Sequence, residues 1–173
     1  ILLNAPITNN FSKGVTISLW VKTDSLSTNG KVLSINHKDT LSSNTSKLGI
    51  DLYYPSHSGW KFALSVSDSS GSHYEVYPSN EAEITTNTWY HIVYTVDPTG
   101  KARVWYNAVE GIGAQINNPE FLTWDLSNYK LQVGSVGEGA DFSGVIDDLI
   151  IYKNVLTDDE IKNLYGKEIT VER

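Results

Sequence analysis

The sequence predicts an all-β protein, a two-sheet antiparallel β-sandwich with one short helix after its last strand. Short segments of alternating apolar and polar residues recur along almost the whole chain, separated by turns rich in Gly, Pro, Asn and Ser. Only one stretch, near the carboxyl end, has apolar residues at helical spacing. Short strands in this number, almost without helices, are typical of antiparallel sandwiches rather than of α/β folds.

The strand pattern is clearest in residues 15–21, where Val15, Ile17 and Leu19 alternate with polar side chains. Residues 97–100, Asp-Pro-Thr-Gly, have the composition of a β-turn. The predicted strands, in order, are residues 15–21, 31–35, 47–54, 59–66, 72–77, 89–96, 101–107, 130–133 and 145–152.

A helix is expected directly after the last of these strands. Thr157 is a suitable N-cap, and Glu160, three residues on, completes a capping box. Ile161 and Leu164 fall on one helical face, which can therefore lie on a sheet. Gly166 is expected to end the helix.

Length and composition limit the possibilities further. The 173 residues fit one domain, which we place at residues 1–166, with residues 167–173 as a tail or the start of a linker. The absence of Cys excludes disulfides, thiol catalysis and zinc–thiolate sites. A net charge of −7 argues against nucleic acid or an anionic membrane as partner. No apolar run approaches the length of a membrane span, so no membrane insertion is predicted.

Four phrases resemble, in the same order, those of the laminin-G-like members of the concanavalin A-like lectin and glucanase superfamily, with patterns such as F-T-I-S-x-W-V-K and F-x-G-x-I-D-[DE]-[VL]-x-I-Y. These phrases are GVTISLWVK (residues 14–22), NTWYHIVYTVD (87–97), RVWYN (103–107) and FSGVIDDLIIY (142–152). The chain departs from the family in two respects. Asn107-Ala108 stands where Asn-Gly is common, and the opening strand, often ending in F-D-G, is not present.

The resemblance implies a concanavalin A-like jelly roll, a fold whose members have several functions. The leading hypothesis is a non-catalytic, lectin-like carbohydrate-binding module of a larger secreted or cell-surface protein. Its partners would be a glycan or cell-surface glycoprotein and the other domains of the same polypeptide, in an extracellular or cell-surface location. The alternatives are a protein-binding adhesion module and a structural spacer domain.

The sequence does not predict an enzyme, although some concanavalin A-like folds are glycanases. Glycanases need two carboxylates flanking the glycosidic bond, and the family's usual Glu-x-Asp-x-x-Glu does not occur here. Asp147 and Asp148 are adjacent, so on a regular strand they would point to opposite faces.

A structural calcium ion is expected from the resemblance, because many relatives hold one near the closing strand. Asp147 matches the first Asp of the I-D-[DE] phrase and is the leading candidate ligand. Asp141 would add a second carboxylate and Gly144 a backbone carbonyl, both oxygen ligands that Ca²⁺ prefers. The other interpretation is that Asp147 accepts hydrogen bonds from backbone amides or pairs with a cation.

Sugar-binding candidates are aromatic residues in loops or at strand ends, beside polar side chains, because flat apolar rings stack on sugar faces. Trp20, Trp89 and Trp105 lie within strand phrases and are expected to be structural. His91 is expected to be a hydrogen-bonded core or sheet-face histidine. The candidate ligand-binding residues are Tyr54, His57, Trp60, Tyr77, Trp124 and Asp125.

Overall fold

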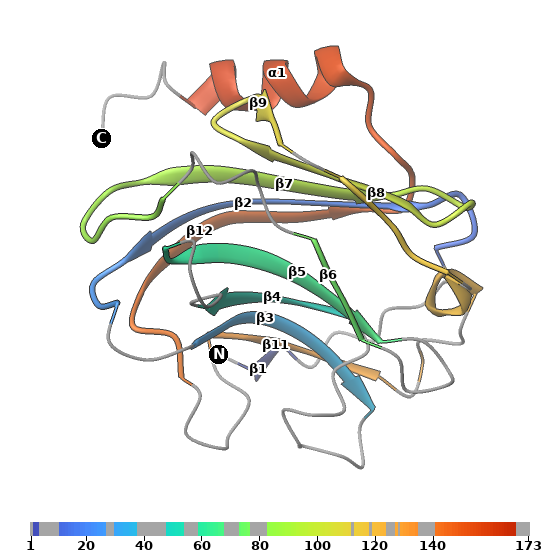
Figure 1. Ribbon diagram of the computed structural model, residues 1–173, viewed down its shortest axis with the longest axis horizontal. Helices are drawn as coiled ribbons and strands as arrows, with labels where there is room; N and C mark the ends of the chain where they lie inside the picture. The colour runs from blue at the N-terminus through green and yellow to red at the C-terminus, as the bar shows by residue number, and fades with distance from the viewer. Residues whose placement is uncertain are drawn as a thin grey trace.

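The computed structural model describes residues 2–3, 11–26, 30–37, 48–53, 59–67, 73–76, 83–111, 113–117, 119–123, 127, 129–134 and 141–168. Within them, two antiparallel sheets lie face to face, and one helix lies across the outer side of the upper sheet (Figure 1). The predicted all-β sandwich with a short helix after the last strand is confirmed. No helix among the described residues is long and apolar enough to cross a membrane.

Sheet A has the strand order β1-β11-β3-β4-β5-β6 and is arched, with its hollow side facing away from the other sheet (Figure 1). Its first strand is only two residues long, too short for any periodicity, and was not expected from the sequence. The strands are β1 (Leu2–Leu3), β3 (Gly30–His37), β4 (Leu48–Tyr53), β5 (Lys61–Ser67), β6 (His73–Val76) and β11 (Tyr129–Val133).

Sheet B has the order β10-β8-β7-β2-β12, and the short strand β9 also pairs with β8. The predicted strands of this sheet are found within one residue or two of their expected ends, whereas β9 and β10 were not foreseen. The strands are β2 (Val15–Thr23), β7 (Tyr90–Val96), β8 (Lys101–Tyr106), β9 (Val109–Glu110), β10 (Ala114–Gln115) and β12 (Gly144–Tyr152). A short 3-10 helix, η2 (Glu120–Thr123), precedes β11.

The main core fills the space between the sheets and follows from the period of two in each strand. Ile17 and Leu19 of β2 face Phe62 and Leu64 of β5 in one continuous cluster of buried side chains. Val93 and the other alternate residues of sheet B point the opposite way, toward the helix. Strands β2 and β7 are therefore buried on both faces.

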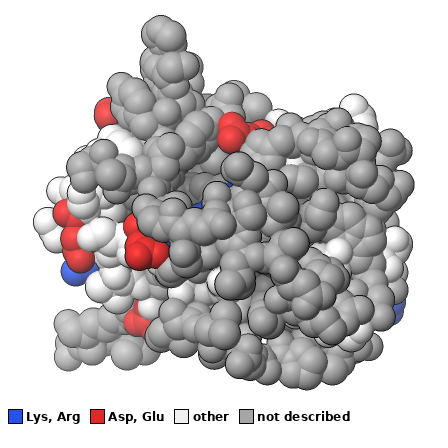
Figure 2. Space-filling model, turned by 90° about the horizontal axis from the view of Figure 1, so that it is seen from below, with Lys and Arg blue, Asp and Glu red and all other residues white. Residues whose placement is uncertain are grey.

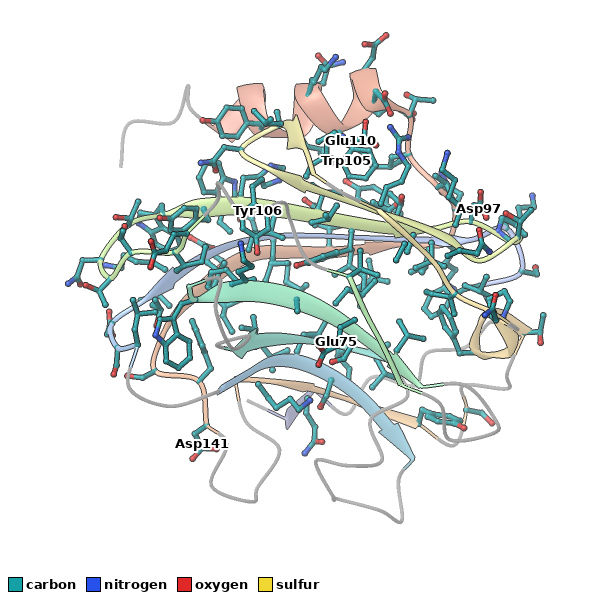
Figure 3. All side chains as sticks on the ribbon, viewed as in Figure 1. Glu75, Asp97, Trp105, Tyr106, Glu110 and Asp141 are labelled. Carbon is teal, nitrogen blue, oxygen red and sulfur yellow. The ribbon has the colours of Figure 1, made fainter. Side chains whose placement is uncertain are left out.

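The helix α1 (Asp158–Glu168) covers the outer face of sheet B through a second, smaller apolar cluster. Leu156 and Ile161 pack there against Val93 and Trp105. Trp105 is buried beneath α1 (Figure 3), as its strand phrase led us to expect. The side chain of Thr16 ties the helix entry to the sheet, because its Oγ1 donates to the Asn154 carbonyl (2.8 Å) and accepts from the Leu156 amide (3.0 Å).

The capping box is formed as predicted. The amide of Thr157 donates to Glu160 Oε2 (2.7 Å), and the Glu160 amide donates to Thr157 Oγ1 (3.3 Å). The expected end of the helix was wrong, because α1 continues through Gly166 to Glu168. Gly166 is not among the residues with positive φ, so it does not adopt the left-handed cap conformation that would terminate the helix there.

Two tyrosine hydroxyls join the sheets inside the core. Tyr94 and Tyr106 of sheet B both donate to the carbonyl of Phe62 in β5, and the Phe62 amide donates back to Tyr106 Oη (2.8 Å). Phe62 lies two residues before Leu64, the first residue of β5 that pairs with β6. The hydroxyls therefore satisfy backbone groups of β5 at a point where no described residue of β6 pairs with it.

Candidate functional site

Several charged side chains and one aromatic side chain lie at one end of sheet A, where β3 begins, β4 ends and β5 begins. The register brings Gly30 opposite Leu52, and Leu52 opposite Phe62, so these strand ends lie side by side. Two inter-strand spacings separate β3 from β5, a span of about 10 Å. We call the five side chains of this region the strand-end cluster: Lys31, Trp60, Lys61, Glu83 and Asp141.

Gly59 holds one side of the cluster together. Its φ is 73°, and a Cβ there would lie 2.9 Å from the carboxyl group of Glu83. The positive φ favours glycine at this position, and the absence of a Cβ leaves room for the Glu83 side chain. The Lys61 side chain, two residues on, is fully buried although it carries a charge. Burial lowers the pKa of the Lys61 ammonium below its ordinary value of 10.5, and the Glu83 carboxylate offsets part of that shift.

On the other side of the strand-end cluster, Gly30 allows a close approach between two backbone segments. A Cβ at this position would lie 2.9 Å from the Cα of Phe142, so only glycine lets the segment before β12 cross here. This crossing forms a parallel bridge between Lys31 and Asp141. The Phe142 ring packs edge-on against Phe62, with ring centroids 6.2 Å apart, and fixes the segment on the core. The exposed Asp141 side chain lies at the lower left of the sandwich (Figure 3).

Trp60 is the one predicted sugar-binding residue that the structure describes. It directly precedes β5, is partly buried and packs against the main core. Its carbonyl accepts the Ile84 amide (3.0 Å), which places the Glu83 segment beside it. An indole that is packed on one side and accessible on the other is a rigid apolar surface next to charged groups. Its role in ligand binding stays a prediction.

The middle of the outer face of sheet A is polar but covered. Gln132, Ser34, Gly49, Ser65 and Glu75 lie opposite one another in register across five strands. Ser34 and Ser65 are buried, whereas Glu75 is exposed on β6. Seen from below, Asp and Glu side chains are visible at several places among the described residues of this side, and Lys or Arg atoms at fewer (Figure 2).

The predicted metal ligands lie along one strand and its approach. Strand β12 places Gly144 opposite Thr23 and Asp147 opposite Trp20 on sheet B, whereas Asp141 bridges to sheet A. The three residues from Gly144 to Asp147 span about 10 Å of extended chain. In the part of the chain that the structure describes, no three His, Asp or Glu residues form a group suited to a metal ion. Calcium binding by Asp147, Asp141 and Gly144 stays a prediction.

Asp147 has a defined local partner. A β-bulge interrupts the pairing of β12 after Asp147, and Asp148 adopts a φ of 47°. The Asp147 carboxylate accepts the Asp148 amide, with an Oδ1–N distance of 2.9 Å. The alternative interpretation of Asp147, as an acceptor for backbone amides, is thus observed. The bulge also overturns the regular alternation that was expected for this acid pair.

The remaining predicted binding residues fall outside the described residues. These are Tyr54, His57, Tyr77, Trp124 and Asp125. Sequence reasoning in turn missed Lys31, Lys61 and Glu83. Alternation along residues 59–66 placed Lys61 on the outer face, but no local signal shows that three strand ends and the Glu83 segment meet there.

The comparisons with known proteins agree with this architecture. The sequence model of the concanavalin A-like lectin/glucanases superfamily matches residues 2–162. No curated protein matches the chain. Solved structures show the same fold at low sequence identity, and three of them are described next.

A heptameric SAP-like pentraxin from Limulus polyphemus superposes with a TM-score of 0.68 at 16% identity, over 88% of this chain and 70% of that chain. Domain 4 of AbnA, an extracellular arabinanase from Geobacillus stearothermophilus, in complex with arabinotriose, gives 0.67 at 23% identity, over 95% and 71%. The CBM40 of a Ruminococcus gnavus sialidase, bound to α2,3 sialyllactose, gives 0.65 at 15% identity, over 92% and 85%. These likenesses support the fold, and the family match covers most of the chain. The chain belongs to the concanavalin A-like lectin/glucanases superfamily.

Proposed function

We propose that this chain is a non-catalytic carbohydrate-binding module of a larger secreted or cell-surface protein, and that it binds glycan at the strand-end cluster. The observation that carries the proposal is that a partly accessible indole, Trp60, lies beside a buried ammonium, Lys61, and the exposed carboxylate of Glu83. A second exposed carboxylate, Asp141, lies beside β3, two strands away. Sugars present both apolar C–H faces and hydroxyl groups, and this set offers a surface for each.

Two of the structural relatives favour the same class of ligand. The arabinanase domain was solved with arabinotriose and the sialidase module with sialyllactose, each over more than nine-tenths of this chain. The span of about 10 Å between β3 and β5 suits a short oligosaccharide better than a broad protein surface. A structural calcium ion, held through Asp147, is part of the proposal but not of the sugar contact.

We expect the module not to hydrolyse glycans, because the sequence lacks the glycanase carboxylate pattern. Incubation of the purified domain with the oligosaccharides that it binds should leave them intact. The appearance of shorter products, at a rate proportional to protein concentration, would overturn this part of the proposal.

The test is a glycan-array screen of the purified domain, with Ca²⁺ and with a chelator, followed by titration of the bound glycans. We expect binding confined to a group of related glycans, and Trp60→Ala to weaken it by about tenfold or more. Trp89→Ala is the matched control, because Trp89 is also partly buried but precedes a strand of sheet B. This variant should bind as the wild type does.

The opposite results are equally informative. Loss of binding in Trp89→Ala with retention in Trp60→Ala would move the site to the other sheet. A blank array in both conditions would favour the protein-binding alternative, for which the exposed Val145 and Ile150 on the edge strand β12 are the first surface to examine.

A further inference from the structure

The carboxyl-terminal half of α1 rests on a row of side chains on the outer face of sheet B. Strands β12, β2 and β7 place Asp147 opposite Trp20 and Trp20 opposite His91. Tyr165 of α1 stacks on Trp20, with ring centroids 5.7 Å apart and planes 18° apart. It also lies over His91, with centroids 5.9 Å apart and planes 28° apart. This end of the helix is therefore seated on an ionisable ring.

His91 is buried, with 1% of its surface exposed. Its Nε2 shares a hydrogen bond of 2.9 Å with Ser18 Oγ, and its backbone amide donates to Asn107 Oδ1 (2.9 Å). The other ring nitrogen, Nδ1, is buried without a hydrogen-bond partner among the described residues, and the same holds for the neighbouring Trp20 Nε1. The imidazole thus has one satisfied nitrogen and one that is not.

This geometry suits a neutral ring and not a charged one. A protonated imidazole carries two N–H donors, and only Nε2 has a partner in place. The second donor would be charged, buried and unpaired between Trp20 and Tyr165, which is the costly arrangement for a polar group. The free-energy cost of protonating His91 is therefore small only when the Tyr165 ring moves away from it.

No charged group among the described residues compensates for this missing partner. Asp147 lies in the same row but beyond Trp20, and the Lys22 ammonium lies over the Trp89 ring in the next row, 5.6 Å from its centroid. From α1, Lys162 lines a cavity with Arg103 at the other end of the helix. Desolvation by burial is accordingly the cause that lowers the pKa of His91 from 6.5 to about 4.

The amino-terminal half of α1 is held in a different way. Arg103 Nη1 lies 2.9 Å from Asp158 Oδ1, and the guanidinium keeps the pKa of this carboxyl below its ordinary value. Leu156 and Ile161 add the apolar contact with sheet B. Mild acid therefore leaves the contacts of this half of the helix in place, whereas protonation of His91 acts directly on the ring beneath Tyr165.

We propose that the carboxyl-terminal half of α1 is an acid-released latch: protonation of His91 frees Tyr165 from sheet B and uncovers Trp20, while the sandwich and the first turn of the helix remain folded. The sandwich persists because its core between the sheets does not include the α1 cluster. The exposed Trp20 ring would then become available as a new apolar surface at the edge of sheet B.

The size of the effect follows from proton linkage. If His91 titrates at about 4 when covered and at 6.5 when uncovered, the ratio of open to closed helix rises by up to about tenfold per pH unit between these values. At pH 5 the open fraction should be roughly 30-fold larger than at pH 7.5.

The test is amide hydrogen exchange of the whole chain between pH 7.5 and pH 4.5, corrected for the intrinsic pH dependence of exchange. Amides of residues 162–166 should lose protection by about tenfold or more, while those of β7 keep theirs. His91→Gln is the matched variant, because its side-chain amide reaches the position of Nε2 beside Ser18 but does not titrate. It should show no such pH-dependent loss. Unchanged protection of 162–166 in the wild type, or the same loss in His91→Gln, would overturn the proposal.

A measurement on the wild type alone guards against a variant that folds poorly. In an NMR titration, the imidazole signals of His91 and the ring signals of Tyr165 should move with one common midpoint, below the ordinary pKa of histidine. Titration of His91 without any response of Tyr165 would show that the helix does not follow the proton, and would equally overturn the proposal.

Discussion

Tyr106 and Phe62 exchange two hydrogen bonds across the core: the Tyr106 hydroxyl donates to the Phe62 carbonyl (2.5 Å) and accepts from its amide (2.8 Å). The phenol of β8 thus satisfies backbone groups of β5 at a point where no described residue of β6 pairs with it. Burial also raises the pKa of Tyr106 far above its ordinary value, so the hydroxyl keeps its proton under all ordinary conditions. Together with Tyr94, this side chain ties the two sheets to each other at this point.

Removing this hydroxyl should cost more than removing its neighbour. Tyr106→Phe leaves the buried Phe62 amide without a partner, and we expect the free energy of unfolding to fall by about 2–3 kcal/mol. Tyr94→Phe leaves the Tyr106 hydroxyl as a donor to the same carbonyl, so the loss should be smaller, about 1 kcal/mol. Urea denaturation of both variants checks the order. Equal losses would show that the amide of Phe62 finds another partner.

The turn between β8 and β9 offers a stabilising substitution. Asn107 and Ala108 have φ values of 50° and 64°, the conformation of a type I′ turn, in which alanine is strained. Ala108→Gly should raise the free energy of unfolding by about 1 kcal/mol. Asn107→Gly should bring no such gain, because the Asn107 side chain accepts the His91 amide (2.9 Å). Thermal melting that ranks the two variants in the opposite order would contradict this account.

Arg103 should not be replaceable by lysine. Its Nε contacts Glu110 (2.6 Å), its Nη1 contacts Asp158 (2.9 Å) and its plane lies over Trp105 at 4.5 Å. A lysine cannot make these three contacts together, so Arg103→Lys should destabilise the protein, and only modestly because the carboxylates are accessible to solvent. Urea denaturation at pH 7 checks this.

The pH dependence of this ion pair has a definite sign. Arg103 lowers the pKa of Asp158 below 3.8, so the pair contributes fully above that value and is lost as the pH falls through the lowered pKa. The wild type should therefore lose part of its advantage over Arg103→Lys as the pH falls below 3.8 and through the lowered pKa of Asp158. Urea denaturation at pH 7 and pH 2.5 checks this, and a constant difference would exclude the pair as its cause.

If Asp147 ligates Ca²⁺, the melting temperature should depend on the presence of the ion. An ion bound only to the folded state at a hundred times its dissociation constant adds about 2.7 kcal/mol, so a chelator should lower the melting temperature by roughly 5–10 °C. Asp147→Asn should remove most of that effect. Asp148→Asn, the same change in charge at the next residue, should retain it. Identical melting with and without chelator would contradict calcium binding at Asp147 and leave its bond to the Asp148 amide as a local structural role.

Much of the fold was predictable because its signals are local. The alternation of Val15, Ile17 and Leu19 predicts β2, and Thr157 with Glu160 predicts the start of α1. The elements that were missed are those whose cause lies elsewhere in the chain. Strand β1 has only two residues and exists because it pairs with β11, and the bulge in β12 depends on its pairing with β2.

The candidate site was less predictable for the same reason. Trp60 was selected because an aromatic residue stands beside a hairpin, and its role stays a prediction, whereas its neighbours Lys61 and Glu83 carry no motif. The positive φ of Gly59 and its contact with Glu83 are consequences of tertiary structure. The burial of Lys61 is such a consequence too.

The order of strands in sheet B also determines when the domain can be completed on the ribosome. Ile17 of β2 lies opposite Tyr94 on one side and Ile151 on the other. At ordinary translation speeds, roughly ten seconds pass between the synthesis of β2 and that of β12. During this interval β2 can pair with β7, but its other edge stays open until β12 emerges. An open strand edge is a template for pairing with another chain, so the nascent domain is most exposed to aggregation before β12 is made.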